Sequence, residues 1–182
     1  MLQGKRTRIR ALAEDDLDDL HRWWNMPELW LHIGSRQKLS SRLELEAWFD
    51  AEGEKLTQEG RTFAILDEDE RLIGTTWYGA FDPTDRQTTV GLYLGDAETR
   101  GKGYGQDALE TLLSYLFDDL GLHKVRLYVL STNQRAIACY DRIGFQTEGT
   151  LRDHRFFAGS FHDFLAMGIL APEWRRSRSQ RA

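Results

Sequence analysis

The chain has 182 residues, 41% of them hydrophobic, and a formal net charge of -5. This length and composition predict one globular domain. The net negative charge disfavours a general nucleic-acid binder, so no direct nucleic-acid partner is expected. Its one cysteine, Cys139, excludes an intrachain disulfide, and its five histidines show no metal-ligand spacing, so no metal is expected. No apolar run approaches the about 20 residues of a membrane span, and the first residues lack the apolar stretch of a signal peptide, which predicts a cytoplasmic protein with no membrane partner.

The first part of the chain predicts one strand followed by two helices. Residues 7–12 read as the strand, and residues 14–25 as an amphipathic helix that Pro27 ends. The second helix begins at a capping box, in which Ser41 and Glu44 stand three residues apart and can each bond the other's main-chain N–H.

The rest of the chain predicts a mixed α/β pattern without a linker or an internal repeat. Strands over 61–66 and 71–81 flank an acidic turn and predict a hairpin. Later elements follow in this order: strand 87–94, helix 106–120, strand 124–130, helix 134–143, and strands near 145–152 and 161–170. The domain is expected to span residues 1–172, and the basic residues 173–182 to form a flexible tail.

The most informative segment is the glycine-rich turn at residues 100–105, with the sequence Arg-Gly-Lys-Gly-Tyr-Gly. It follows a predicted strand and opens a predicted helix. Its glycines lack the Cβ atoms that would keep a diphosphate away from the main chain, and the first turn of the helix offers N–H donors and a positive dipole end. The segment is therefore interpreted as a pyrophosphate cradle, with added positive charge from Arg100 and Lys102.

Two other phosphate-binding loops fit this turn poorly. A P-loop has four residues between its first glycine and Gly-Lys-Ser/Thr, whereas five residues separate Gly95 from Gly101, and the residue after Lys102 is a glycine without a hydroxyl. The relaxed dinucleotide pattern can be traced through Gly103, Gly105 and Ala108. It requires an acidic residue at the end of the next strand, where this chain has Ser131.

Arg100, Gly103 and Gly105 match a third pattern, Arg/Gln-x-x-Gly-x-Gly/Ala, which resembles the acyl-CoA-binding signature of a known superfamily. A second block, residues 133–145, contains an asparagine, a predicted helix, a tyrosine and a Gly-Phe pair. Together they resemble the GNAT superfamily of acetyl-CoA-dependent N-acetyltransferases. The resemblance implies the GNAT fold, an α/β (α+β) fold with a mixed, mostly antiparallel central sheet of about seven strands, flanked by helices, whose fourth and fifth strands splay apart.

The resemblance also implies acetyl-CoA as cosubstrate. Its pantetheine arm would enter the gap between the splayed strands and bind main-chain groups there, since an unpaired strand edge accepts such bonds. Asn133 also stands where a helix N-cap belongs, so a cap and a cofactor contact can coexist. The implied cofactor-binding residues are Leu92, Tyr93, Leu94, Arg100, Gly101, Lys102, Gly103, Tyr104, Gly105, Asn133 and Ala136.

The implied chemistry is attack by a neutral amine on the acetyl thioester, with a main-chain N–H near Leu94 to stabilise the oxyanion. Tyr140 falls on the family's motif and is the candidate catalytic residue, because a phenol can reprotonate the departing thiolate. The alternative is a tyrosine that only packs. Cys139 has no histidine partner in sequence and is expected to belong to the core rather than to act as a nucleophile.

The general base is not assigned by the sequence. Many relatives carry a glutamate where this chain has Thr89, which cannot serve as a base. Other titratable side chains could accept the proton directly or through water, and none is singled out: Glu28, Glu44, Asp82, Asp85 and His154.

The resemblance implies that the acceptor is an amine of a small molecule or a protein N-terminus. Gly159 and Asp163 match a hairpin turn that resembles ribosomal-protein N-terminal and spermidine acetyltransferases, which favours a protein N-terminus or a polyamine. Aminoglycosides and amino-acid-like amines stay open, as does a non-catalytic acyl-CoA sensor, and a homodimer is compatible with the family. A narrow acidic pocket would favour a small cationic amine. Four aromatic residues could line that pocket or fill the core: Trp23, Trp24, Trp30 and Trp77.

Overall fold

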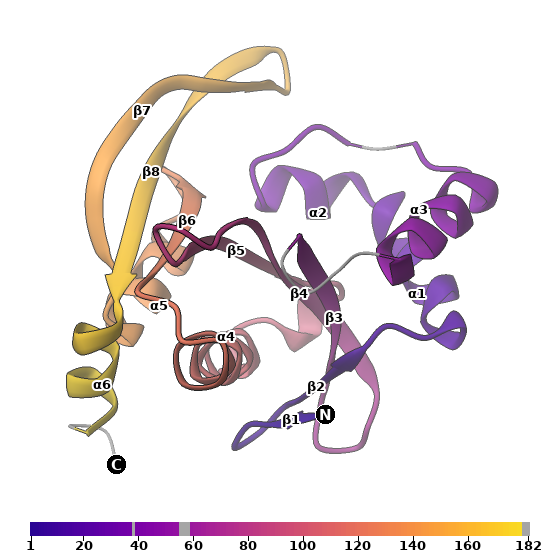
Figure 1. Cartoon of the computed structure of the whole chain (residues 1–182). Coiled ribbons are helices and arrows are strands. Elements are labelled where there is room, and N and C mark those ends of the chain that lie inside the picture. Colours follow the sequence, from indigo (N-terminus) through magenta and orange to yellow (C-terminus); the bar gives the residue numbers. More distant parts are fainter. Residues whose placement is uncertain (38, 55–58, 180–182) are drawn as a thin grey trace.

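The computed structural model describes residues 1–37, 39–54 and 59–179. Within these residues the centre is an eight-stranded sheet with the order β1-β2-β3-β4-β5-β6-β8-β7, antiparallel except between β5 and β6 (Figure 1). The strands are β1 (Leu2–Gln3), β2 (Arg8–Ala11), β3 (Gly60–Leu66), β4 (Leu72–Asp82), β5 (Gln87–Leu94), β6 (Lys124–Leu130), β7 (Gln146–Phe157) and β8 (Ser160–Leu170). The predicted mixed, mostly antiparallel sheet is confirmed, with β1 as an additional short strand.

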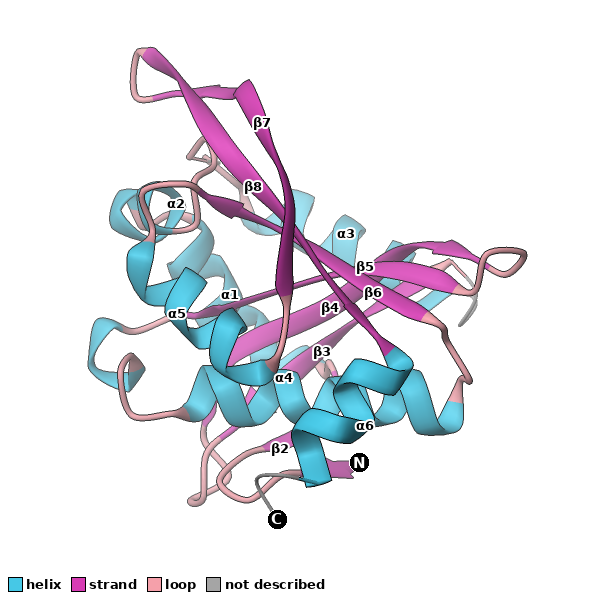
Figure 2. Cartoon of the chain, turned by 90° about the vertical axis from the view of Figure 1, so that its left-hand side faces the viewer, coloured by secondary structure: helices cyan, strands magenta, loops and turns pink. Residues whose placement is uncertain are grey.

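Helices cover both sides of the sheet, with α4 on one side and α1 to α3 on the other (Figures 1 and 2). The helical segments are η1 (Glu14–Asp16), α1 (Leu17–Trp24), α2 (Pro27–His32), α3 (Arg42–Glu54), η2 (Ala97–Thr99), α4 (Tyr104–Ser114), the π-helical η3 (Tyr115–Asp119), α5 (Gln134–Ile143) and α6 (Ala171–Ser179). No helix among the described residues is both long and apolar enough to cross a membrane.

Two hydrophobic clusters follow this arrangement. The larger joins the sheet to α4 and α5 and includes Leu109, Leu112 and Val125, each fully buried. The smaller joins α1, α2 and α3 around the buried Trp23 and Leu45, with the partly buried Tyr93 of β5 packed against it. The strand β5 therefore contributes side chains to both clusters, and sites on its two faces have different surroundings.

Two segments differ from the sequence predictions. Pro27 ends α1 as expected but also begins α2, because proline suits the first position of a helix, where its missing N–H is not needed. The expected flexible tail is helical as far as Ser179. The Trp174 side chain is only 2% exposed and stacks on Phe117 at 6.3 Å between ring centroids. Residues 173–179 are therefore helical, and the buried Trp174 side chain gives a physical reason for the helix that the arginines did not indicate.

The expected splaying of β5 and β6 is confirmed. Their pairing covers only Gln87–Thr89 with Lys124–Arg126, although β5 continues to Leu94 and β6 to Leu130. Residues 92–94 remain paired with β4 on their other side, and β6 remains paired with β8 along its whole length. Beyond Thr89, the facing edges of β5 and β6 therefore have no strand between them.

Candidate active site

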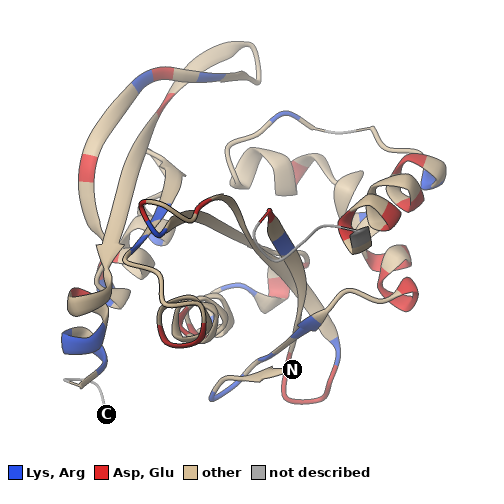
Figure 3. Cartoon of the chain, viewed as in Figure 1, with Lys and Arg blue, Asp and Glu red and all other residues tan. Residues whose placement is uncertain are grey.

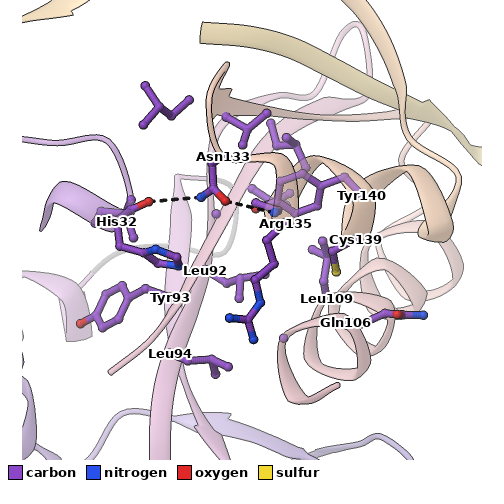
Figure 4. Close-up of a pocket in the computed structure, with 18 of the residues that line it drawn as sticks. His32, Leu92, Tyr93, Leu94, Gln106, Leu109, Asn133, Arg135, Cys139 and Tyr140 are labelled. Carbon is purple, nitrogen blue, oxygen red and sulfur yellow. Dashed lines mark hydrogen bonds between the residues drawn. The ribbon is translucent and has the colours of Figure 1, made fainter. Parts of the chain in front are cut away.

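A cavity of about 420 Å³ lies where β5 and β6 separate, and α4, α5 and the end of α2 add to its walls (Figure 4). Its lining includes ten residues that the sequence placed in the site: Leu92, Tyr93, Leu94, Arg100, Gly101, Gly103, Gly105, Asn133, Ala136 and Tyr140. The two sequence blocks, which are separated along the chain, thus meet in one cavity.

The glycine-rich loop forms one end of this cavity. Gly101 and Gly103 have φ angles of 81° and 89°, in the left-handed region that strains any residue with a Cβ. Gly103 is the N-cap of α4, so the first-turn N–H groups of that helix begin directly after it. A Cβ at Gly101 would lie 2.2 Å from Nη2 of Arg135. Bare main chain, helix N–H donors and a guanidinium therefore meet at this point, which is an arrangement that binds phosphate.

Arg100 and Arg135 bring two positive charges to the same end. Arg100 donates from Nη2 to the carbonyl of Gly95 at 2.8 Å and from Nε to that of Leu94 at 3.3 Å, so it also fixes the end of β5. Burial and the neighbouring Arg135 lower the pKa of Arg100. Asp96 opposes this shift without cancelling it, and an anionic ligand would further stabilise the positive charge.

Arg135 was not predicted from the sequence, yet its position carried a signal. It lies in the first turn of α5, where the helix dipole favours acidic residues and where this helix has none. A cation at that position is unfavourable unless an anion lies nearby. Arg135 lies against the glycine loop, and a phosphate bound there would be the anion that stabilises this cation.

Two predicted cofactor residues, Lys102 and Tyr104, do not line the cavity. The hydroxyl of Tyr104 donates to Glu68 at 2.8 Å, and the guanidinium of Arg6 lies over the Tyr104 ring at 4.7 Å. Arg6 also donates to the carbonyl of Lys102. These contacts brace the loop from its outer side, so the Tyr104 side chain supports the loop's shape rather than facing the cavity.

Asn133 joins two elements of the wall. Its Oδ1 accepts from the main-chain N–H of Ala136 at 3.1 Å, which is the expected N-cap, and its Nδ2 donates to the carbonyl of His32 at 3.2 Å (Figure 4). The cap and the contact with α2 use both ends of the amide. Asn133 therefore fixes the start of α5 relative to the end of α2.

His32 was also missed by the sequence predictions, and its side chain lines the cavity from α2 (Figure 4). Burial lowers its pKa, and the charges of Arg100 and Arg135 lower it further. An imidazole with a lowered pKa is largely neutral at neutral pH and can accept a proton. Only its position in three dimensions identifies it, since no motif covers this part of the chain.

Tyr140 lines the cavity from α5 and packs against Phe145 at 6.0 Å between ring centroids. Burial raises its pKa, so the phenol keeps its proton and can donate it. Cys139 packs against the larger hydrophobic cluster, as expected, but it also lines the cavity. Burial raises the pKa of its thiol too, and the thiol form is a poor nucleophile.

None of the five carboxylates and histidines considered as the base lines the cavity among the described residues. The ring of one of them, His154, lies 6.0 Å from that of Tyr128, a residue of the wall. Thr89 lines the cavity at the last paired position of β5 and β6. Across the described part of the chain, no group of three or more His, Cys, Asp or Glu side chains could hold a metal ion.

The four tryptophans divide between packing and cavity walls. Trp23 is fully buried and lies against Gly95, where a Cβ would be 1.9 Å from its ring. Trp77 lies over Gly91, where a Cβ would be 2.6 Å from the ring, and it is 38% exposed on the cavity wall. Trp24 and Trp30 are buried beside a second cavity.

Comparison with known families identifies this arrangement. Residues 6–146 match the acetyltransferase (GNAT) domain, and the chain therefore belongs to the GNAT N-acetyltransferase family. Members of this family use acetyl-CoA. The glycine loop, the two arginines and the open strand edge fit that molecule's diphosphate and its amide-containing arm.

Similar proteins include acetyltransferases with different acceptors. The chain is 27% identical over 166 residues to the spermidine N(1)-acetyltransferase of Vibrio cholerae, covering 91% of this chain and 94% of that protein. It is 31% identical over 106 residues, 58% of this chain and 57% of the relative, to YdaF of Bacillus subtilis, described as a candidate ribosomal N-acetyltransferase. The crystal structure of the spermidine N-acetyltransferase from Vibrio cholerae with CoA and spermine superposes with a TM-score of 0.85 at 27% identity, covering 93% of this chain and 98% of that one.

Proposed function

We propose that this protein moves the acetyl group of acetyl-CoA to a primary amine by direct attack within a ternary complex, with a polyamine or a protein N-terminus as acceptor. The observation that supports this most is the cavity in which the glycine loop, two guanidiniums and the open edge of β5 meet. The loop suits a diphosphate, and the strand edge suits a chain of amides. A cytoplasmic location and a homodimer stay predictions.

Tyr140 is the proposed proton donor to the leaving thiolate. Burial raises its pKa, so the phenol carries a proton when the thiolate forms, and its place on the wall gives it access to the cavity. The amide cap at Asn133 fixes the helix that carries it. When bound, acetyl-CoA supplies the acetyl group and the thiolate.

His32 is the proposed proton acceptor, in the absence of a glutamate at Thr89. It lines the same cavity as Tyr140, and the two charged groups that act on it are Arg100, just before α4, and Arg135 on α5. Burial lowers the pKa of His32, and both arginines lower it further, so the accepting form persists to lower pH than in a free imidazole. In the His32→Gln variant we expect kcat to fall by about 10²-fold. We also expect the decrease of kcat at low pH, which reports protonation of the base, to disappear. An unchanged decrease at low pH would exclude His32 as the base.

The function is tested by measuring thiol release from acetyl-CoA with a panel of amines, beside calorimetry of acetyl-CoA alone. The panel contains spermidine, aminoglycosides, free amino acids, and short peptides with Ala or Ser at the N-terminus. We expect micromolar or tighter cofactor binding and turnover with an amine. Binding without turnover on any amine would favour the alternative of a non-catalytic acyl-CoA sensor, and an absence of binding would contradict the cofactor assignment.

A further inference from the structure

A second cavity, of about 480 Å³, lies between the helices α1 to α3 and the strands β3 and β4. We call it the aromatic cavity, because side chains of its wall include Trp24, Trp30, Trp48, Trp77, Tyr78 and Tyr93. Three of its wall residues, Ile33, Trp77 and Tyr93, also line the first cavity, between β5 and β6, which we call the cofactor cavity after its proposed ligand. A molecule that extends from one cavity into the other would therefore pass along these shared side chains.

The aromatic rings are held in place by one another. Trp24 meets Trp48 edge to face, with ring centroids 4.9 Å apart, and its indole N–H donates to the hydroxyl of Tyr93 at 3.1 Å. The indole N–H of Trp30 donates to the carbonyl of Trp24 at 2.6 Å. Rings fixed in this way present a preformed aromatic surface, and such surfaces attract organic cations through the negative faces of the rings.

Two carboxylates belong to the same wall. Glu52 of α3 is only 8% exposed, and its Oε1 accepts from the main-chain N–H of Thr62 at 2.9 Å. Glu59 lines the cavity from the turn before β3. Acidic residues also gather on α1 and α3, two of the helices that contribute to the wall of this cavity (Figure 3). Carboxylates combined with aromatic rings select a positively charged guest over a neutral one of the same shape.

We infer that the aromatic cavity binds a second cationic group of the acceptor, an ammonium on an alkyl chain whose other amine is presented to acetyl-CoA. The inference rests on the proposed acetyl transfer and narrows its acceptor to a small amine with two or more positive charges. A folded protein that offers its N-terminus places a peptide chain behind the reacting amine, and the carboxylates of this cavity give no reason to prefer it.

The first test is calorimetry with 1,5-diaminopentane, with pentylamine as a probe of the same chain length and one charge. We expect the diamine to bind the wild-type protein about 10-fold or more tightly than the monoamine. Glu52→Gln keeps an oxygen that can accept from Thr62 but removes the charge, and it should abolish this preference. Asp50→Asn removes a charge from an exposed position on the same helix, outside the cavity, and should preserve it.

The second test measures kcat/KM for acetylation of both amines by the same proteins and by Trp48→Ala. We expect the ratio of diamine to monoamine to fall about 10-fold in Glu52→Gln and Trp48→Ala and to stay at the wild-type value in Asp50→Asn. Diamine binding without acetylation would contradict the proposed function and leave the binding site supported. Acetylation with no preference for the diamine, or with the same preference in Glu52→Gln, would overturn the inference and leave the function standing.

Discussion

Main-chain groups form two parts of the cofactor cavity, the glycine loop and the open edge of β5, whereas side chains form the wall of the aromatic cavity beside it. At the first, two glycines with positive φ and the open edge of β5 present peptide groups. At the second, indole and phenol rings and two carboxylates make the wall. In the proposed function, the main chain of the first cavity recognises the diphosphate and amides of acetyl-CoA, and the side chains of the second recognise the acceptor. Substitutions on the two sides should therefore affect different kinetic constants.

The largest expected effect comes from Gly103→Asp. A carboxylate about 4 Å from a phosphate costs about 4 kcal/mol where the effective dielectric constant is near 20, which sets an upper limit on the order of 10³-fold for the loss of acetyl-CoA affinity. Arg6 offsets part of this cost, because its Nη1 would lie 3.8 Å from a Cβ at this position. Calorimetry on the folded variant measures the loss of affinity. Gly103→Asn is the matched control, since asparagine has the same shape and tolerates a left-handed backbone, and it should keep most of the affinity. Equal affinities for the Asp and Asn variants would contradict the cradle.

Next comes Tyr140→Phe, which should lower kcat by about 10²-fold while leaving acetyl-CoA affinity near that of the wild type, because only the proton donor is removed. Steady-state kinetics and calorimetry together separate these two quantities. If turnover stays at the wild-type rate, Tyr140 is a packing residue.

Gly95→Ala tests the point where the smaller hydrophobic cluster, at Trp23, meets the cofactor cavity, at Arg100. The added Cβ would meet the Trp23 ring, and overpacking of this kind costs about 1–3 kcal/mol of the free energy of unfolding. Acetyl-CoA affinity should also fall, because the Gly95 carbonyl accepts from Arg100. Urea unfolding gives the first quantity and calorimetry the second. Gly149→Ala, at a position with open space around it, serves as control and should leave both near wild type.

Asn133→Ala should have the smallest effect, a loss of about 1 kcal/mol in the free energy of unfolding, because the α5 N-cap is removed. Asn133→Ser retains a capping oxygen but cannot keep the bond to the His32 carbonyl. We expect urea unfolding to show the serine variant closer to wild type than the alanine variant. Identical losses in the two variants would assign the stabilisation to the contact with α2 instead of the cap.

The parts of the molecule that could be predicted are those specified by local sequence. The glycines at 101 and 103, the cap at Asn133 and the alternation of strands and helices each follow from short-range rules, and the structure has them in the expected places. The splayed strands were expected only through the family resemblance, since no local pattern records where two strands separate.

The missed residues depend on long-range packing. His32 lies at the cavity because the end of α2 meets the N-cap residue of α5, Asn133, which is more than 100 positions away in the chain. Trp48 and Glu52 form a wall with β3 and β4 only after α3 packs on the sheet. The α6 helix was missed because one buried tryptophan outweighs several solvated arginines. Composition alone does not show whether burial of the tryptophan or solvation of the arginines determines the structure of this segment.

During synthesis, β6 and β7 leave the ribosome before the strand that joins them, because β8 follows both in the chain and lies between them in the sheet. Until residue 170 has emerged, β6 has an unpaired edge along Lys124–Leu130, and the long β7 has no complete partner. Unpaired edges of this kind associate with other chains. A fragment that stops before β8 is therefore expected to aggregate, although it contains both of the motifs that identify the family.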